Sequence, residues 1–402
     1  MKLTEVDRQS ARLLLEDFLN TPSINGTAGE LLFAEKICAY LQKAGLKAQL
    51  EQLDEQRANV LLCVPGSDRS RNIVLNGHLD TVKYGDLSSW NTPPESAARV
   101  GNRLFARGAA DMKAGLAGMV FVLAELSRKS IVPSVDIWFA ASCDEEAGGA
   151  GARACQEKEW LKRADFILVG EPTSLQLGLC EKGCNWLRFI VHGKTGHGAY
   201  PERGVNAIEH GFAILERVKA QVKKHIHPLL GASTMQITQL SAGIAPNMTP
   251  DRAEFVLDIR NTPTLSNEAL FDLLKNESAT ESDQTAGLLS TEIEIINSRP
   301  PLESSPSEAW IQAINKSFEK VMDKAATAAG VSFFTDASLF VQVNHKAPTL
   351  LFGPGEPELC HQANESVELK QYEQYIEILM EAALRAASVE NEPNPAKIDW
   401  KC

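Results

Sequence analysis

The 402-residue sequence predicts an α/β protein with a mixed sheet covered by helices, and a smaller α+β domain inserted into it. Up to about residue 183, runs rich in Val, Ile, Leu and Phe alternate with helical patterns, as in sheets that helices cover on both faces. From Asn185 onwards the order changes to strand–helix–strand–strand–helix–strand, the order of a ferredoxin-like domain. A chain of this length also exceeds the ~250–300 residues at which a single core stops growing.

The first part of the chain begins with an amphipathic pattern over 1–20, where charged residues interrupt the apolar ones as on a half-buried helix. A second helical pattern covers 28–44, and a pattern rich in Ala, Gly and Leu covers 111–127. The β-rich runs between and after them are 59–64, 72–79, 135–141 and 165–169.

The inserted domain is predicted to span 184–297. Its expected strands are 185–192, 235–240, 253–260 and 292–296, and its expected helices are 205–222 and 267–275. A segment rich in Ser and Pro at 297–306 is typical of a linker back to the main domain, which then comprises 1–183 and 298–402. The returning part is predicted to contain helices at 308–320, 321–329 and 367–386 and a strand at 349–352.

Composition excludes some classes of function. The net charge of -12 argues against nucleic-acid binding, because backbone phosphates need a basic surface. The charged residues within 1–20 argue against a signal peptide, and no apolar run reaches the ~18 residues of a membrane span. Eight scattered cysteines do not form a dense disulfide framework. We therefore expect a cytoplasmic protein that binds neither membrane nor nucleic acid.

Acidic and histidine side chains follow the ends of three predicted strands. His78 follows the apolar residues 73–75 near the end of 72–79, Glu145 and Glu146 follow 135–141, and Glu171 follows 165–169. Ligands of α/β sheets bind at the carboxyl ends of the strands, so these residues should converge. Asp111 precedes the small-residue helix, where it could also serve only as that helix's N-cap.

Such a cluster predicts a metal site, because buried carboxylates and imidazoles need a cation to compensate them. Oxygen and nitrogen ligands without thiolate suit Zn²⁺ or a similar divalent ion, and the number of ligands favours two ions sharing one carboxylate. Asp80 shares a strand face with His78 and is placed to accept its other ring N–H. Adjacent carboxylates at Glu145 and Glu146 point in different directions, so one can bind metal while the other acts as a general base.

The sequence resembles the M20 metallopeptidases, the dinuclear zinc amidohydrolases that include acetylornithine deacetylase and succinyl-diaminopimelate desuccinylase. The matching motifs occur in the family's order over residues 70–370. They are Gly-His78-Leu-Asp80-Thr-Val, Arg-Gly-Ala-Ala-Asp111-Met-Lys, Asp-Glu145-Glu146, Gly-Glu171-Pro-Thr, Gly193-Lys-Thr-Gly-His197 with Gly204-Val-Asn-Ala, and Cys-His361-Gln-Ala-Asn-Glu365. One departure is Ala363, which stands where the family commonly has proline.

The resemblance implies roles for individual residues. One metal would be bound by His78 and Glu171, the other by Glu146 and His361, with Asp111 as the bridge. Glu145 would be the general base, and Asp80 would support His78. His197 lies in the inserted domain. In relatives that the sequence resembles, its counterpart reaches the active site of the other subunit of a dimer and stabilises the oxyanion. Arg260 and Asn247 resemble residues that hold a substrate carboxylate.

The same resemblance implies a metal-dependent hydrolase of an amide bond in an N-acyl amino acid or short peptide. It would carry two divalent ions, Zn²⁺ or alternatively Co²⁺ or Mn²⁺, and form a homodimer through the inserted domain. The sequence Glu181-Lys182-Gly183 favours an acetylornithine deacetylase-like activity over desuccinylation. A dipeptidase or carboxypeptidase with the same metals is an alternative. A non-catalytic metal-binding scaffold is another.

Overall fold

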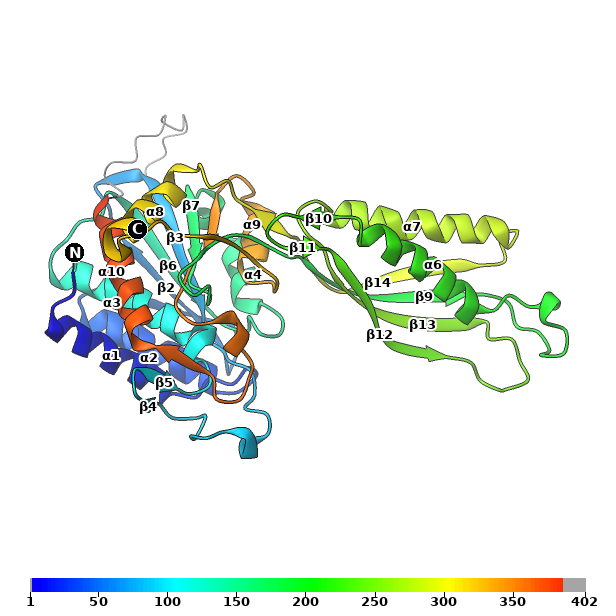
Figure 1. Ribbon diagram of the computed structural model, residues 1–402, viewed down its shortest axis with the longest axis horizontal. Coiled ribbons are helices and arrows are strands. Elements are labelled where there is room, and N and C mark those ends of the chain that lie inside the picture. The colour runs from blue at the N-terminus through cyan, green and yellow to red at the C-terminus, as the bar shows by residue number, and fades with distance from the viewer. Residues whose placement is uncertain (1, 386–402) are drawn as a thin grey trace. The chain divides into compact units, whose positions relative to one another are not determined.

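The computed structural model describes residues 2–385, with side chains up to Ala383 (Figure 1). Contacts within the described chain divide it into two compact units. Unit 1 comprises 2–179, 304–329 and 335–385, and unit 2 comprises 180–303 and 330–334. The range 184–297 for the inserted domain remains a prediction. Residues 386–402 of the predicted range 298–402 lie outside the described residues.

The main sheet has the strand order β1-β2-β6-β3-β7-β17-β8-β15, and β16 pairs with β8. It is mixed, as predicted: β3 runs parallel to β6 and β7, whereas β2 runs antiparallel to β6. Its strands are β1 (Gln49–Gln52), β2 (Ala58–Val64), β3 (Asp68–His78), β6 (Val135–Ser142), β7 (Phe166–Val169), β8 (Leu177–Glu181), β15 (Leu302–Glu303), β16 (Ala328–Val331) and β17 (Thr349–Leu351).

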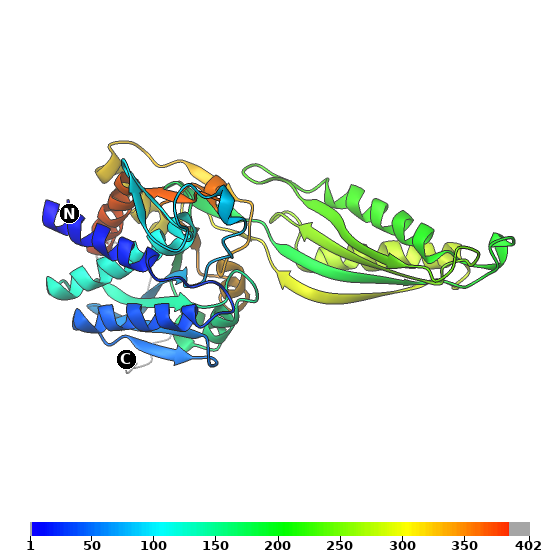
Figure 2. The same cartoon turned by 90° about the horizontal axis from the view of Figure 1, so that it is seen from below.

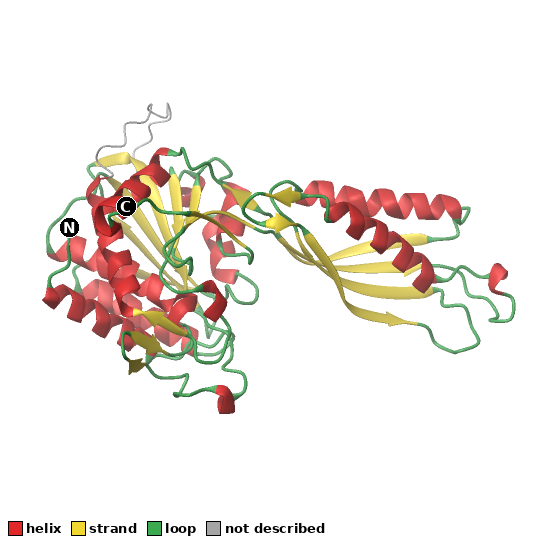
Figure 3. Cartoon of the chain, in the orientation of Figure 1, coloured by secondary structure: helices red, strands yellow, loops and turns green. Residues whose placement is uncertain are grey.

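Helices cover this sheet (Figure 3). They are α1 (Glu5–Leu19), α2 (Gly29–Lys43), α3 (Ala114–Arg128), α4 (Ala150–Gln156), α5 (Glu159–Lys162), α8 (Ala309–Met322), α9 (Ala337–Val343) and α10 (Leu369–Arg385). Every residue of α3 from Ala114 to Leu126 is buried, which explains its richness in Ala, Gly and Leu. A short three-stranded sheet of β4 (Ala98–Val100), β5 (Arg103–Phe105) and β18 (Ser366–Glu368) completes unit 1.

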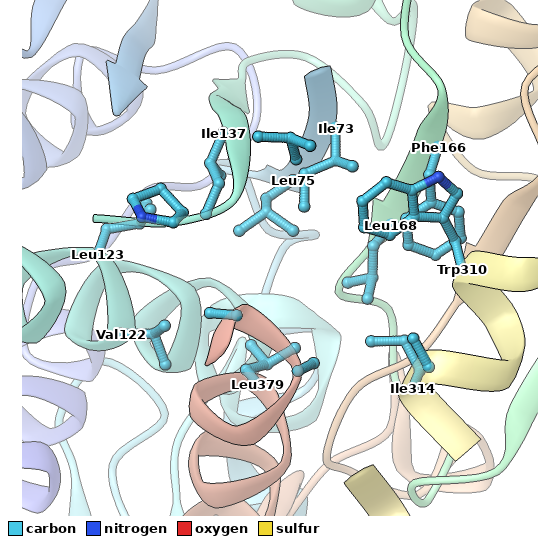
Figure 4. A pocket seen from close by; sticks show the side chains of 15 residues that line it. Ile73, Leu75, Val122, Leu123, Ile137, Phe166, Leu168, Trp310, Ile314 and Leu379 are labelled. Atoms are coloured by element: carbon cyan, nitrogen blue, oxygen red, sulfur yellow. The ribbon is translucent and has the colours of Figure 1, made fainter. Parts of the chain in front are cut away.

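An apolar pocket lies between the sheet and the helices α3, α8 and α10 (Figure 4). Ile137 and Leu168 line it from the sheet, and Val122, Ile314 and Leu379 line it from the three helices. Phe166, the first residue of β7, and Pro133, ahead of β6, also line it. The pocket therefore lies towards the amino ends of these strands, away from the predicted metal ligands.

Unit 2 has a four-stranded antiparallel sheet in the order β12-β13-β9-β14. The helices α6 and α7 pack against one of its faces (Figures 1 and 2). Side chains of β13 alternate accordingly, with Ala253, Phe255 and Leu257 buried on the helix side. The chain order is β9 (Cys184–His192), α6 (Ala207–Val222), β12 (Thr234–Ala242), β13 (Arg252–Arg260), α7 (Asn267–Gln284) and β14 (Ser290–Arg299), which confirms the predicted order.

Some sequence-based expectations were wrong. The helix predicted at 321–329 is absent, because Asp323 adopts a left-handed conformation (φ 53°) that ends α8, and Ala328–Val331 instead forms β16. The predicted helix 367–386 begins with strand β18 rather than with a helical turn. The predicted linker at 297–306 contains the end of β14 and all of β15. Within residues 2–385, each helix is too short or too polar to cross a membrane.

Candidate metal centre

Three parallel strands of unit 1 deliver acidic and histidine side chains to the same edge of the sheet. His78 is the last residue of β3 and lies opposite Ser142, the last residue of β6. The chain continues from β6 to Glu145 and Glu146, and from β7 to Glu171. Because parallel strands present their carboxyl ends at one edge, these residues gather there.

Asp111 and His361 reach this edge on two other segments. Asp111 lies in a wide turn, Ala109–Lys113, where its φ of -117° and ψ of 99° are not helical. It does not cap α3, because the N-cap residue is Lys113 and no side chain caps that helix end. His361 follows the short helix Pro357–Leu359 and has a positive φ of 63°.

The carboxylate of Asp111 lies between two imidazole rings. Its Oδ1 is 3.0 Å from Nε2 of His78, and its Oδ2 is 3.3 Å from Nε2 of His361. Each imidazole also faces a second carboxylate: Oε2 of Glu146 is 3.0 Å from His361 Nε2, and Oε1 of Glu171 is 4.0 Å from His78 Nε2. Single ligand atoms of His78, Asp111 and Glu146 all lie within 4.8 Å of one another.

Burial and close contacts shift the protonation of this cluster. Burial raises the pKa of Glu171 well above its ordinary value, although the positive charge of His78 opposes this. Burial also opposes ionisation of Asp111, but hydrogen bonds with His361 and His78 hold its pKa below the ordinary value. Hydrogen bonds with Asp111 and Glu146 raise the pKa of His361 to about 10. The buried carboxylates thus draw positive charge towards the site.

Glu145 differs from the other carboxylates because one of its oxygens has no partner. The residue is 6% exposed, and its Oε1 is buried without a hydrogen bond among the described residues. Burial raises its pKa well above the ordinary value, and the negative charges of Asp336 and Glu171 add to this while His78 opposes it. A buried, unpaired carboxylate oxygen beside the candidate ligands is suited to exchange a proton with a bound water or substrate.

Asp80 contacts His78 differently from the prediction. The ring Nδ1 of His78 lies 2.9 Å from the backbone carbonyl oxygen of Asp80, while the nearest carboxylate oxygen is 3.7 Å away. The carboxylate instead accepts hydrogen bonds from the backbone N–H groups of Glu145 and Glu146, both at 3.0 Å. Both carboxylate oxygens of Asp80 are thus hydrogen-bonded to the loop after β6. Asp80 positions the backbone of the two glutamates through its carboxylate and the ring of His78 through its carbonyl oxygen.

Asn25 is a part of this arrangement that sequence reasoning missed. Its Nδ2 donates to Oδ2 of Asp80 at 2.9 Å and to Oδ1 of Asp144 at 3.1 Å. It is placed there because Ile24 pairs with Thr81 beside β3. A single asparagine in a polar loop carries no sequence signal for this role.

The remaining predicted site residues lie in unit 2. His197 and Asn247 are exposed and lie on neighbouring loops, where Gly198 N–H donates to the Asn247 carbonyl oxygen at 2.8 Å and His197 pairs with Met248. Arg260 is the last residue of β13, and its Nε is 2.7 Å from Oδ1 of Asp258. The structure therefore brings His197 and Asn247 together but separates both from Arg260.

The residues at the sheet edge of unit 1 fit divalent metal ions. Their donors are imidazole nitrogens and carboxylate oxygens, which suit Zn²⁺ and similar first-row ions. The two oxygens of Asp111 point to different imidazoles, which is the arrangement that a carboxylate shared by two ions requires. The unpaired oxygen of Glu145 is consistent with a water or substrate atom beside those ions.

Comparison with known proteins identifies the family of the chain. Residues 74–385 match peptidase family M20/M25/M40. A probable succinyl-diaminopimelate desuccinylase of Staphylococcus aureus is 28% identical over 382 residues, covering 87% of this chain and 92% of that protein. An acetylornithine deacetylase of Vibrio cholerae is 29% identical over 382 residues, covering 91% and 96%.

Solved structures share the fold. An aminopeptidase PepT from Bacillus cereus has a TM-score of 0.77 at 19% identity and covers 95% of this chain and 99% of its own. An M20 family metallo-carboxypeptidase from Sulfolobus solfataricus has a TM-score of 0.72 at 21% identity, covering 95% and 99%. Because the family match extends over more than half of the sequence, this chain belongs to peptidase family M20/M25/M40 and is a metallohydrolase.

Proposed function

We propose that the chain is an acetylornithine deacetylase-like enzyme, which hydrolyses the amide bond of an N-acyl amino acid with two divalent metal ions. The observation that carries the proposal is the Asp111 carboxylate between His78 and His361, with a further glutamate beside each imidazole. The 28–29% identity to a desuccinylase and a deacetylase, over nearly the full length, favours an N-acyl amino acid as the substrate.

The residues divide into two ligand sets. His78 and Glu171 would bind one ion, Glu146 and His361 the other, and Asp111 would bridge them. The ions are proposed to be Zn²⁺, with Co²⁺ or Mn²⁺ as alternatives. When bound, such ions polarise a carbonyl group and lower the pKa of water.

Glu145 is proposed as the general base and then the general acid. It takes a proton from the attacking water while the new C–O bond forms. It returns that proton to the leaving nitrogen when the C–N bond breaks, giving a carboxylic acid and an amine. Asp80 holds the backbone of Glu145 in place, so the carboxylate keeps its orientation through both transfers.

Unit 2 supports a homodimeric site. β13 runs nine residues from Arg252 to Arg260, so its ends are roughly 27 Å apart at ~3.3 Å per residue. His197 and Asn247 lie beyond its first end and Arg260 at its last. They cannot hold one small substrate from the same chain, so we propose that Arg260 acts in its own subunit's site and is complemented by the partner's His197 and the partner's Asn247.

Arg260 is proposed to hold the substrate carboxylate. Its ion pair with Asp258 and the nearby rings of Trp186 and Phe334, 6.0 Å and 5.7 Å from its guanidinium carbon, hold the group in one orientation. A fixed guanidinium forms charge-assisted hydrogen bonds with a carboxylate at little entropic cost. We therefore expect amino-acid derivatives with a free α-carboxylate to be preferred.

A substrate panel tests the proposal. The protein is stripped of metal, reconstituted separately with Zn²⁺, Co²⁺ and Mn²⁺, and assayed with N-acetyl amino acids, N-succinyl amino acids and dipeptides. We expect kcat/KM for an N-acetyl amino acid, N-acetylornithine first among them, to exceed that for any dipeptide by at least about tenfold, a difference of ~1.4 kcal/mol in transition-state binding.

The outcomes separate the alternatives. Higher kcat/KM on dipeptides would replace the deacylase by a dipeptidase or carboxypeptidase. Stoichiometric metal without hydrolysis of any compound would indicate the binding scaffold. The Glu145→Gln protein, purified in parallel, corrects for contaminating host hydrolases. The proposed cytoplasmic location is checked separately, by fractionating cells of the source organism.

A further inference from the structure

Glu365 is a buried carboxylate close to the metal centre with no predicted role. It lies four residues after His361 and is 0% exposed. Its hydrogen bonds do not go to the predicted metal ligands' side chains. They come from Arg107 Nη1 at 2.6 Å and from the backbone N–H groups of Gly108 at 3.1 Å, Ala110 at 2.9 Å and Asp111 at 3.0 Å.

These bonds hold the segment that carries Asp111. The segment leaves regular helical geometry at Asp111, so its N–H groups lack the partners that a helix would provide. Glu365 Oε1 accepts from both Ala110 and Asp111, and Oε2 accepts from Gly108 and Arg107. Both oxygens are therefore used to fix one short stretch of backbone.

Glu365 also closes a ring of contacts around the site. The side chain of Asp111 touches His361 through Oδ2 and Nε2 at 3.3 Å, and four residues later Glu365 holds the Asp111 backbone. Asp80 acts in a parallel way on the other side, where its carboxylate accepts from the N–H groups of Glu145 and Glu146. Each of two buried carboxylates thus holds the backbone of a segment with a candidate ligand.

We infer that Glu365 is a positioning residue, which sets the Asp111 carboxylate between the two imidazoles and so determines the affinity for both ions. The inference rests on the proposed function in one respect, that divalent ions bind at Asp111. It does not depend on which amide bond is cleaved.

The test measures zinc affinity of Glu365→Gln by competition with a chromophoric chelator. The amide cannot accept from all four donors, so we expect affinity to fall by about 10- to 100-fold, as for other residues that orient metal ligands. The matched control is Glu356→Gln, which removes a bidentate ion pair with Arg103 (2.9 and 2.7 Å) from the same loop without touching Asp111. We expect its zinc affinity to stay within about threefold of the wild type.

Loss of charge at Glu365 leaves Arg107 buried without its ion partner and could prevent folding. The double variant Glu365→Gln/Arg107→Gln removes both charges and should still lose zinc affinity. The same loss in Arg107→Gln alone would assign the effect to the ion pair and overturn the inference. Zinc affinity equal to that of the wild type, in folded Glu365→Gln or in the folded double variant, would also overturn the inference.

The readout distinguishes two kinds of failure. If the wild type binds zinc but hydrolyses none of the panel, the proposed activity fails while the inference is still decided by affinity. Wild-type protein that binds none of Zn²⁺, Co²⁺ and Mn²⁺ would overturn both. A circular-dichroism melting curve for each variant separates lost folding from lost affinity, because a merely structural role would lower the melting temperature without weakening zinc binding by the folded protein.

Discussion

Three candidate ligands of unit 1 and two candidate residues of unit 2 are held in opposite ways. His78, Asp111 and Glu171 are buried, at 2%, 9% and 2% exposed, and follow strands or turns fixed by the core. His197 and Asn247 are exposed on loops that bond mainly to each other. The three side chains of unit 1 are therefore fixed relative to one another. His197 and Asn247, by contrast, are not surrounded by other candidate catalytic residues of unit 2.

The difference bears on the catalytic role proposed for unit 1 and the dimer contact proposed for unit 2. A buried cluster of carboxylates is costly unless it binds cations, so its geometry implies a ligand. An exposed histidine on a loop carries no such cost, and it gains a role only when another surface approaches it. Variants in the two units should therefore behave differently, and the following experiments test that difference.

The largest effect is expected in unit 1, for Glu145→Gln. The amide keeps the shape of the side chain but cannot transfer the proton, so kcat should fall by about 10²–10⁴-fold. Zinc content should stay at the wild-type value, because Glu145 is not a proposed ligand. Near-normal turnover would show that another group is the base, and loss of zinc would show that Glu145 is a ligand.

The next effect tests whether unit 2 works across subunits. His197→Ala alone should lower kcat by about 10²–10³-fold, the loss typical of one oxyanion donor. Differently tagged Glu145→Gln and His197→Ala chains are then coexpressed and the mixed dimers purified. Each mixed dimer would regain one of its two sites and about half the wild-type activity, because that site combines an intact Glu145 with the partner's His197.

Activity of the mixed dimer at the level of the single variants would contradict a site shared between subunits. If His197 serves the site of its own subunit, each site of the mixed dimer lacks one group and no activity is regained. A double variant, Glu145→Gln/His197→Ala, paired with the wild type is the matched control. It places both changes in one chain and, in the dimeric arrangement, should leave both sites incomplete.

Much of unit 1 could be predicted from local sequence. Strand ends are marked by the change from apolar runs to Gly, His and acidic residues, so the convergence of His78, Glu146 and Glu171 could be predicted from their positions at the carboxyl ends of strands. The order of elements in unit 2 followed from alternation, as in the buried Phe255 and Leu257 of β13. In both regions the signal is local and needs no long-range information.

The rest depends on contacts between distant segments. Asn25 reaches Asp80 because Ile24, ahead of α2, pairs with Thr81 in the segment that follows β3. The helix predicted at 321–329 does not form, because Asp323 has a left-handed conformation and the residues that follow pair with β8 as strand β16. Neither property is encoded in local periodicity, since tertiary pairing overrides propensity.

A smaller effect is expected at the other end of β13, for Arg260→Gln. The loss of charge-assisted hydrogen bonds should lower kcat/KM by about 10- to 100-fold for substrates with a free α-carboxylate. Substrates whose carboxylate is amidated should be affected much less. Arg252→Gln is the matched control, because it removes an ion-paired arginine (with Glu254) from the first end of the same strand. Equal losses on both kinds of substrate would contradict carboxylate binding by Arg260.

The last prediction concerns stability instead of activity, and it returns to unit 1. Glu30 is buried beneath the Asp144 loop and accepts from the N–H groups of Gly26 at 2.8 Å and Asp144 at 3.0 Å. Burial, together with the negative charges of Asp80 and Asp144, raises its pKa from 4.5 to about 7. Between these pH values the folded protein keeps a proton that the unfolded chain has lost, so stability falls as pH rises from 4.5 to 7 and then levels off.

The change attributable to Glu30 is at most about 3 kcal/mol, at 1.36 kcal/mol per pKa unit. It is measured by urea unfolding of metal-free protein at pH 5, 6, 7 and 8, as the difference between wild type and Glu30→Gln. Because residue 30 of the variant cannot ionise, the free energy of unfolding of the variant should rise relative to that of the wild type as the pH increases to 7. Above pH 7 the difference should stay constant. Glu35→Gln, on the exposed side of the same helix α2, should follow the wild type at every pH. A difference between wild type and Glu30→Gln that is constant with pH would show that Glu30 is already ionised at pH 5 in the folded protein, and that burial and the charges of Asp80 and Asp144 do not raise its pKa.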